Sequence, residues 1–224
     1  MAKHIKKCAT TFGVLGFICL LGLCFEFVII LFEQFIYDKT YNKFTITESI
    51  THWLIISGLW GILGLVLFYI SARVYNFNFS KKKNLPSERG WIVAVLLFLT
   101  SFGLKFRIYG GWKPATDFMQ SGWFQFIFQY IYYLFQAVII LIMVIFTQEA
   151  TDRALKTHKL KFRHIPWGGI ILAATWGAVH LVTEANFTVA IYYIILSLLA
   201  GAAHLAVNKN VYISYVLTVV ILLI

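Results

Sequence analysis

Seven stretches of mainly apolar residues divide the chain, and short polar connections separate them. They cover residues 10–36, 51–72, 91–109, 122–147, 167–184, 187–206 and 210–224. A helix needs about 20 apolar residues to cross the hydrocarbon core of a bilayer, and all but the last stretch approach or exceed that length. The pattern therefore predicts an all-α membrane protein of about seven transmembrane helices.

The amino-acid composition argues against a soluble domain. Apolar residues make up 60% of the 224 positions, charged residues make up 12%, and the mean hydropathy is +0.80. A soluble domain carries about 25% charged residues, so lipid must be the solvent here. The first stretch exceeds the core of a signal peptide, which has about 7–15 residues, and we expect it to stay as an anchor. We expect a single membrane domain.

The basic residues gather in every second connection. Fourteen of the 19 Lys and Arg residues lie in the N-terminal segment and in the connections 73–90, 148–166 and 207–210. By the positive-inside rule, the N-terminus is cytoplasmic and, with seven spans, the C-terminus lies outside. The net charge of +10 then reflects topology and attraction to anionic lipid headgroups. We expect membrane lipids as partners and no nucleic acid.

Ionisable side chains inside or beside apolar stretches require a reason, because each costs about 2.5–3.5 kcal/mol at the bilayer centre. Glu33 and Glu184 lie near the outer ends of their stretches and should reach the interface. Glu26 lies deeper, and we expect a structural partner or a protonated carboxyl. His204 lies near the inner end of its stretch, at the interface. The full set is Glu26, Glu33, Glu149, His180, Glu184 and His204.

Glu149 and His180 flank a basic connection, and their spacing predicts that they meet. If the chain reverses near residues 164–165 and the preceding helix continues through Lys156, each lies about 15 residues from the reversal. At a rise of 1.5 Å per residue, both are then about 22 Å above it, at one level between adjacent antiparallel helices. A carboxylate facing a histidine at low dielectric suits general acid–base chemistry or a metal. A structural hydrogen bond that locks the two helices is the alternative.

Two protein ligands are too few for a well-held zinc ion, since catalytic zinc sites use at least three. We therefore expect no tightly bound metal and no other cofactor, unless a third ligand comes from elsewhere. The same level argument places His204 about 20 Å closer to the cytoplasm than His180. We do not expect His204 to join the pair.

Two segments around these residues resemble motifs of the CAAX protease and bacteriocin-processing (CPBP) family of intramembrane peptidases. Residues 146–153, Phe-Thr-Gln-Glu-Ala-Thr-Asp-Arg, are similar to the first motif, Glu-Glu-x-x-x-Arg. Residues 176–180, Trp-Gly-Ala-Val-His, are similar to the second, Phe-x-x-x-His. The resemblance covers residues 122–224 and implies a four-helix core there, with residues 1–121 forming leading transmembrane helices.

The resemblance implies a hydrolytic site at membrane depth. In it, Glu149 would polarise a water molecule, His180 would be a proton partner or ligand, and Arg153 would pair with a carboxylate. Gln148 stands where the family has its usual general base. An amide has no useful basicity and can only form hydrogen bonds, so Glu149 would have to take over that role.

The family's third motif, His-x-x-x-Asn, can be placed in two registers. His204 and Asn208 fit it as a string. However, Gly201 and the polar turn that follows resemble the segment before the family's last core helix. On that register, Thr218 and Leu222 take the places of His and Asn. The level argument favours this second register, in which the chain retains half of a catalytic site.

Two functions follow from the resemblance. The first is a divergent intramembrane endopeptidase that acts on a membrane-associated peptide or protein in a bacterial cell membrane, with catalysis impaired by Gln148. The second is a catalytically silent relative that binds a membrane peptide or membrane-protein partner and regulates or protects it, as suggested for immunity-type members. A small transporter or channel fits less well, because we find no inverted repeat and no pair of Gly- or Pro-broken helices.

Overall fold

The computed structural model describes residues 2–77, 79, 85–155, 164–183 and 187–224, with side chains from residue 9 onward and not at 182–183. In this part of the chain every regular element is helical. The elements are α1 (Ala2–Tyr37), a 3₁₀ turn η1 (Tyr41–Lys43), α2 (Ile46–Val74), α3 (Glu88–Tyr109), α4 (Lys113–Ala154), α5 (Trp167–Leu172), a π-helical segment η3 (Ala173–Gly177), α6 (Ala178–Thr183), α7 (Phe187–Ala206) and α8 (Val211–Leu223).

Five of the described helices are long and apolar enough to cross a membrane: α1, α2, α3, α4 and α7. Two shorter apolar segments, Trp167–Leu181 and Val211–Leu223, accompany them. The prediction of a helical, multi-pass membrane protein is confirmed at this level. Each predicted stretch lies on its own helix except the fifth, which is divided among α5, η3 and α6.

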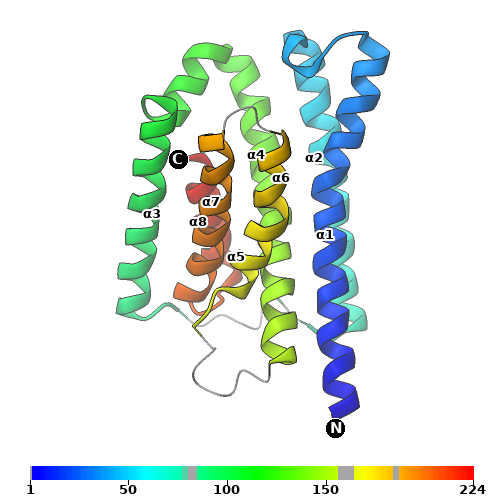
Figure 1. Ribbon diagram of the computed structural model, residues 1–224, viewed down its shortest axis with the longest axis vertical. Coiled ribbons are helices and arrows are strands. Elements are labelled where there is room, and N and C mark those ends of the chain that lie inside the picture. The colour runs from blue at the N-terminus through cyan, green and yellow to red at the C-terminus, as the bar shows by residue number, and fades with distance from the viewer. Residues whose placement is uncertain (1, 78, 80–84, 156–163, 184–186) are drawn as a thin grey trace.

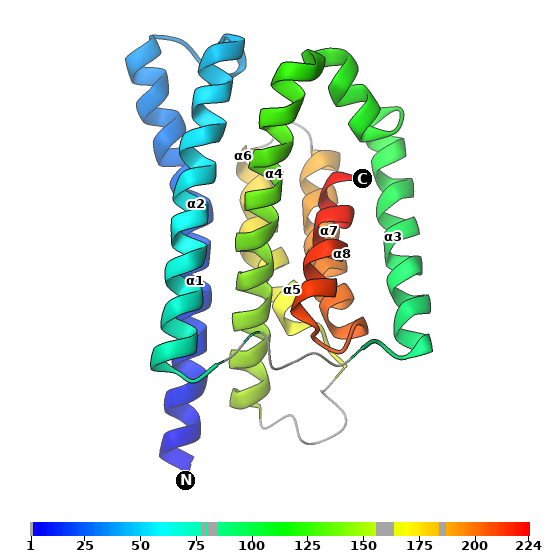
Figure 2. The ribbon, with the colours of Figure 1, turned by 180° about the vertical axis from the view of Figure 1, so that it is seen from behind.

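The helices form one upright bundle with α4 at its centre (Figures 1 and 2). Helices α1 and α2 lie side by side at one edge, α3 lies at the other, and α5 to α8 lie between them. Helix α4 packs against α1, α2, α5 and α8. Its residues 139–148 are buried without interruption, as expected for a helix that is enclosed on every side.

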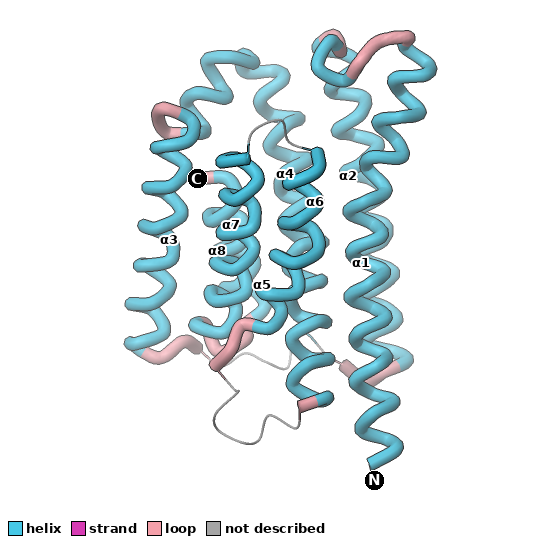
Figure 3. The backbone as a smooth tube through the Cα atoms, viewed as in Figure 1, coloured by secondary structure: helices cyan, strands magenta, loops and turns pink. Residues whose placement is uncertain are grey.

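Connections lie at the two ends of the bundle (Figure 3). We call the end that carries the N-terminus the N-terminal end; the chain also passes there between α2 and α3, between α4 and α5, and between α7 and α8. The opposite end carries the connections from α1 to α2 and from α3 to α4. The described ends of the predicted basic connections therefore all lie at the N-terminal end.

Polar caps fix where several helices begin and end. The Thr45 side chain accepts a hydrogen bond from the Glu48 backbone N–H while the Glu48 carboxylate accepts one from Thr45, which makes a capping box at the start of α2. Ser87 and Asn210 cap α3 and α8 in the same way through single bonds. Gly110 ends α3 in the left-handed conformation that glycine adopts without steric cost.

Helix α4 begins nine residues earlier than the predicted start at residue 122. Residues 113–121 form helical turns at the opposite end, and Gly122 then bends the chain into the long central segment with φ 70° and ψ 166°. Glycine suits this bend because a Cβ atom disfavours positive φ.

Close backbone contacts between glycines draw α5 against α4 and α7. A Cβ atom built on Gly201 would lie 2.3 Å from the Cα atom of Gly169, and one built on Gly168 would lie 2.3 Å from the Val144 carbonyl oxygen. Small residues allow such close approach between helices in membranes, where packing drives helix association. These glycines therefore set the depth at which α5 meets its neighbours.

Helix α8 is short, and its C-terminal end is held inside the bundle. Its 13 residues span about 20 Å, less than the hydrocarbon thickness of about 30 Å. The Ile221 carbonyl accepts hydrogen bonds from Ser101 Oγ at 2.8 Å and from Lys105 Nζ at 2.5 Å, both from α3. A hydroxyl and a cation thus satisfy carbonyl groups that the end of a helix leaves open.

Candidate functional site

Gln148 joins α4 to the beginning of α5 at the N-terminal end of the bundle. Its amide oxygen accepts a hydrogen bond from the Gly168 backbone N–H at 2.9 Å, and its amide nitrogen donates to Asp152 Oδ1 at 3.0 Å. The same nitrogen lies 3.4 Å from the Ile165 carbonyl oxygen. The side chain is 2% exposed. Both halves of this amide are therefore occupied by bonds that hold the helix connection.

The prediction that Glu149 meets His180 is wrong, because the contact between Gln148 and Gly168 fixes a different level for the two helices. Gln148 and Gly168 share one level, and His180 follows Gly168 by twelve residues, which is about 18 Å of helical rise. Helix α4 ends at Ala154 instead of continuing through Lys156. Glu149 is consequently near the level of Gly168, and the acid and the histidine lie at different depths.

Glu149 pairs with Arg153 one helical turn further along α4. Its Oε1 atom accepts hydrogen bonds from Arg153 Nε at 2.9 Å and from Arg153 Nη2 at 2.7 Å. The guanidinium also lies over the Phe12 ring of α1, 4.5 Å from its centroid. The predicted pairing of Arg153 with a carboxylate is thus found, and the carboxylate is that of the presumed base itself. Two guanidinium nitrogens therefore occupy one oxygen of the Glu149 carboxylate.

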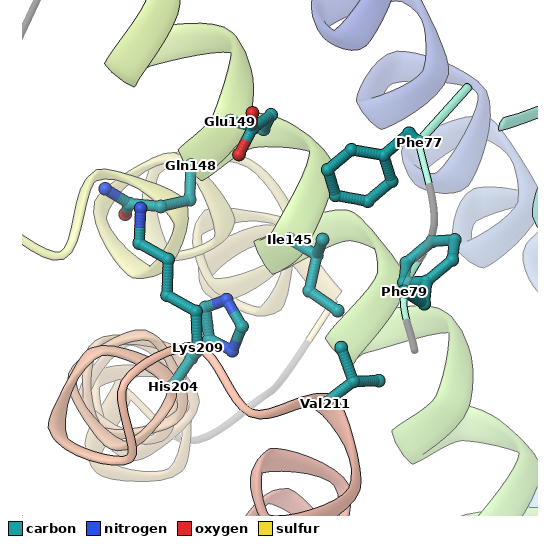
Figure 4. Close-up of a pocket in the computed structure, with 8 residues that line it drawn as sticks. All are labelled: Phe77, Phe79, Ile145, Gln148, Glu149, His204, Lys209 and Val211. Atoms are coloured by element: carbon teal, nitrogen blue, oxygen red, sulfur yellow. The ribbon is translucent and has the colours of Figure 1, made fainter. Parts of the chain in front are cut away.

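His204 lies beside Gln148 and Glu149, far from His180, as the level argument places the two histidines; the expectation that His204 stays apart from Glu149 is wrong because Glu149 itself lies at the lower level. The side chains of Gln148, Glu149 and His204 line one cavity of about 10 Å³, which has room for a single water molecule (Figure 4). His204 is 2% exposed, and its Nδ1 atom lies 2.8 Å from the Ser214 hydroxyl of α8. It is therefore a buried residue and not an interfacial one. The remaining lining residues are Phe77, Phe79, Ile145, Lys209 and Val211.

The two registers of the third motif point to different places in the molecule. Asn208 has a left-handed backbone in the turn between α7 and α8, and its amide donates to the Leu85 carbonyl at 2.9 Å, away from the small cavity. The neighbouring Lys209 forms an ion pair with Asp152. Thr218 is buried in α8, and Leu222 faces a larger cavity that His180 also lines.

This larger cavity, which we call the central cavity, has a volume of about 380 Å³. His180 stacks on Tyr193 with ring centroids 3.9 Å apart and meets Trp176 edge to face at 4.9 Å. Charged, amide and aromatic side chains from most of the helices form the walls. The lining residues are Leu23, Glu26, Phe27, Ile30, Tyr41, Trp53, Tyr109, Lys113, Gln129, Tyr132, Tyr133, Gln136, Trp176, His180, Tyr192, Tyr193, Leu196 and Leu222.

A buried chain of titratable groups supports one wall of the central cavity. His52 Nδ1 lies 2.6 Å from Glu33 Oε2, and His52 Nε2 lies 3.6 Å from Glu26 Oε1. The Tyr132 hydroxyl donates to Glu26 Oε1 at 2.5 Å. Glu33 is 4% exposed, so the prediction that it reaches the interface is wrong. The expected structural partner of Glu26 is found, in the form of Tyr132 and His52.

Sequence reasoning missed His52, although the sequence carries a signal for it. Glu26 and Glu33 are seven residues apart, which places both on one face of a helix. His52 is the second residue of the predicted stretch 51–72, where an ionisable group needs a partner. Two acids on one helix face and one histidine in the next helix are a plausible ion-pair set.

A second ion pair lies at the wall nearest the start of α4. Lys113 forms an ion pair with Asp117, and the Tyr130 hydroxyl donates to Asp117 at 3.2 Å. The Lys113 ammonium also lies 4.8 Å from the centroid of the Tyr133 ring and 5.2 Å from that of Tyr109. The aromatic wall of the cavity therefore already contacts one cation.

The described residues separate the predicted site into two parts with different chemistry. Gln148, Glu149, Arg153 and His204 share the N-terminal end, whereas His180 belongs to the central cavity. In the described part of the chain, no three His, Cys, Asp or Glu side chains are placed to hold a metal ion. Glu184 lies outside the described residues. Comparisons with protein-family models, with curated proteins and with solved structures found no match to this chain.

Proposed function

We propose that this protein binds a membrane peptide or membrane-protein partner without cutting it, as a catalytically silent relative of the CPBP peptidases. The observation that carries the proposal is the bonding of Gln148. Its amide oxygen accepts from Gly168 while its amide nitrogen donates to Asp152. A glutamate at this position would turn a carboxylate oxygen toward the Asp152 carboxylate, so the local structure favours the amide over a general base.

The state of Glu149 supports the same proposal. Its carboxylate is bonded by Arg153 through two nitrogen atoms, and the cavity beside it holds no more than one water molecule. His180, the expected proton partner, lies about 18 Å away along the bundle. A peptide bond would find neither room nor a complete acid–base pair here.

An apolar groove supports the binding part of the proposal. It lies between α2, α4 and α8, has a volume of about 390 Å³, and is lined by apolar and aromatic side chains. Val216 and Tyr212 at its edge are 59% and 61% exposed. In a bilayer this surface suits an apolar helix of a partner, because association there depends on close packing.

An intramembrane endopeptidase is the second candidate, and one observation favours it. Gln148, Glu149 and His204 line a single cavity, which is the arrangement that the first register of the third motif requires. In this version Glu149 would be the base and His204 its proton partner. Asn208 would have to leave the Leu85 carbonyl to take part.

A reconstitution experiment separates the two candidates. Wild type and Glu149→Gln are placed in liposomes with a panel of membrane-spanning peptides, and products are read by mass spectrometry. A photo-crosslinking residue at Val216 reports binding, with one at Val28, which is 54% exposed on α1, as the matched control. We expect no cleavage and stronger crosslinking at 216. Cleavage by wild type that Glu149→Gln abolishes would establish the peptidase, and equal crosslinking at both positions would overturn binding in the groove.

We also propose that all seven apolar segments belong to the membrane, in a bacterial cell membrane with the N-terminus in the cytoplasm. The gathering of 14 of 19 basic residues in the N-terminal segment and in every second predicted connection supports this orientation. In a variant whose three cysteines are replaced by alanine, Asn42→Cys should react with an impermeant maleimide in intact cells. Glu88→Cys, at the other end, should react only after permeabilisation. The reverse pattern would contradict the orientation.

A further inference from the structure

We propose that the central cavity is a binding site for a small organic cation of the alkylammonium class. The carboxylate of the site, Glu26, lies outside the segments compared with the CPBP motifs, although Trp176 and His180 of the second motif also line this cavity. The inference holds whether or not Glu149 and its neighbours at the N-terminal end cut a peptide. It depends on three features of the cavity: a positioned carboxylate, aromatic walls and a volume that fits a small ligand.

Glu26 supplies the carboxylate. It lines the cavity, and its Oε1 atom is held by the Tyr132 hydroxyl at 2.5 Å and approached by His52 Nε2 at 3.6 Å. Behind it, Glu33 holds the other nitrogen of His52 at 2.6 Å. Because the Tyr132 hydroxyl holds the Oε1 atom, the orientation of the carboxylate is set before a ligand enters.

The arrangement of charged groups around the cavity favours a cation. Glu26 and Lys113 are its charged lining residues, and Lys113 is already neutralised by Asp117. The carboxyl groups of Glu26 and Glu33 share a single imidazole, that of His52. The nearby Lys105 is directed to the carbonyls at the end of α8. Among the lining residues, the Glu26 carboxyl group therefore lies apart from the Lys113–Asp117 ion pair, and a carboxylate in a setting of low dielectric attracts a cationic ligand.

Aromatic rings form the rest of the enclosure. Trp53, Trp176, Tyr132, Tyr133 and Tyr193 face the cavity from four different elements. The faces of such rings attract ammonium groups, and cages of this kind bind quaternary ammonium ligands. Lys113 over the Tyr133 and Tyr109 rings is an instance of this contact within the protein itself.

The volume of the cavity sets the size of the ligand. At about 380 Å³ it lies at the lower end of the range for small-molecule sites, which is about 300–1,000 Å³. A headgroup of the size of choline fits this space. The cation can come from a free amine or from the headgroup of a lipid, and the chemistry recognised is the same for both.

Choline is the probe that tests the proposal, with 3,3-dimethylbutan-1-ol as its neutral isostere. Binding to wild type in maltoside detergent is measured by calorimetry and by the fluorescence of Trp53 and Trp176, which line the cavity. We expect saturable binding of choline at least about tenfold tighter than that of the alcohol, because the charge contributes through Glu26 and the rings. Equal binding of the two, or no saturable binding of choline, would overturn the proposal without any variant.

Two variants identify the carboxylate. Glu26→Gln should weaken choline binding about tenfold, while the matched change Glu88→Gln, at an exposed acid in the first turn of α3, should leave it unchanged. Unchanged binding in a folded Glu26→Gln protein would overturn the site. Nanodiscs of phosphatidylglycerol with and without phosphatidylcholine then separate the sources. Competition by phosphatidylcholine identifies a lipid headgroup as the ligand, and its absence identifies a free cation.

Discussion

At the scale of single residues, Gln148 shows how one side chain can hold a fold and exclude a chemistry. Its amide both donates and accepts, and each function is used: Asp152 on one side and Gly168 on the other. An ionised carboxylate can only accept. The identity of this residue is therefore dictated by its neighbours in the structure, whatever position it occupies in a motif.

Replacing Gln148 with glutamate should destabilise the protein. The change removes the donor to Asp152 and brings two carboxylates together in a place where the side chain is 2% exposed. We expect a loss of about 1–3 kcal/mol in the free energy of unfolding, measured by thermal unfolding of the purified protein in detergent. The matched change Gln120→Glu, at an exposed position of α4, should have little effect. Equal melting of Gln148→Glu and wild type would show that the amide is not needed.

His52 offers a second test at this scale. The change His52→Ala removes the imidazole partner of Glu33, which is 4% exposed. It leaves an empty space beside the Glu33 carboxyl group. Breaking a buried pair on one side costs about 3–5 kcal/mol, so we expect a marked drop in the unfolding temperature in detergent. Glu33→Gln keeps an acceptor for His52 and should lose less. A His52→Ala protein as stable as wild type would contradict the structural importance of this pair.

The sequence predicted the surroundings of a residue well where the energetic cost of a charge in the bilayer decides them. It predicted them poorly where a partner side chain on another helix decides them. The need of Glu26 for a structural partner followed from the energetic cost of a charge in a bilayer, whereas the pairing of Arg153 with a carboxylate was implied by the resemblance to the first CPBP motif. Glu33 was misplaced because its partner, His52, is 19 residues further along the chain. Pairing across helices is a property of the packed bundle, which local sequence does not reveal.

At the scale of elements, glycines and caps determine how the helices meet. Gly169 and Gly201 let α5 and α7 touch through their backbones, and the Gly168 N–H is free of side-chain bulk to reach Gln148. Helix α8 ends against Ser101 and Lys105 of α3. Neighbouring helices, and not propensity alone, therefore fix where the short segments begin and end.

The glycine contact between α5 and α7 leads to a prediction with a matched control. In Gly201→Ala, the new methyl group would lie 2.3 Å from the Gly169 Cα atom, so the helices must separate. We expect a loss of about 1–3 kcal/mol in unfolding free energy. Gly13→Ala on α1 has open space around the new Cβ and should be neutral or slightly stabilising, because alanine favours the helix over glycine. Thermal unfolding in detergent compares the two, and equal loss in both would contradict the close packing.

The positions of the helices were largely predictable, but the reversal between α4 and α5 was not. Apolar length placed each stretch on a helix. The end of α4 at Ala154 has no proline or glycine to mark it, since residues 150–156 read as continuing helix. When two helices run antiparallel, an error in the position of the reversal counts twice in deciding which residues of the two helices lie at the same level. The prediction therefore placed Glu149 at the level of His180.

At the scale of the whole molecule, the bundle has two distinct regions. The N-terminal end collects basic residues and interlocked ion pairs around a space for one water molecule. The middle of the bundle holds the central cavity with a carboxylate and aromatic walls. Composition predicted the membrane class correctly, whereas the central cavity depends on side chains from six or more segments that no single stretch displays. The binding proposals rest on this separation of the two regions.

The separation can be measured directly as one distance. Leu155 follows Gln148 by seven residues, and Leu181 follows Gly168 by thirteen in the opposite direction; both are exposed, at 47% and 43%. Spin labels on Leu155→Cys and Leu181→Cys, in a variant whose native cysteines are replaced, allow a pulsed EPR distance in nanodiscs. Twenty residues of helical rise predict about 30 Å between the labels. If Glu149 and His180 met at one level, only seven residues of helical rise, about 10 Å along the bundle, would separate the same labels, and that result would restore the acid–histidine pair.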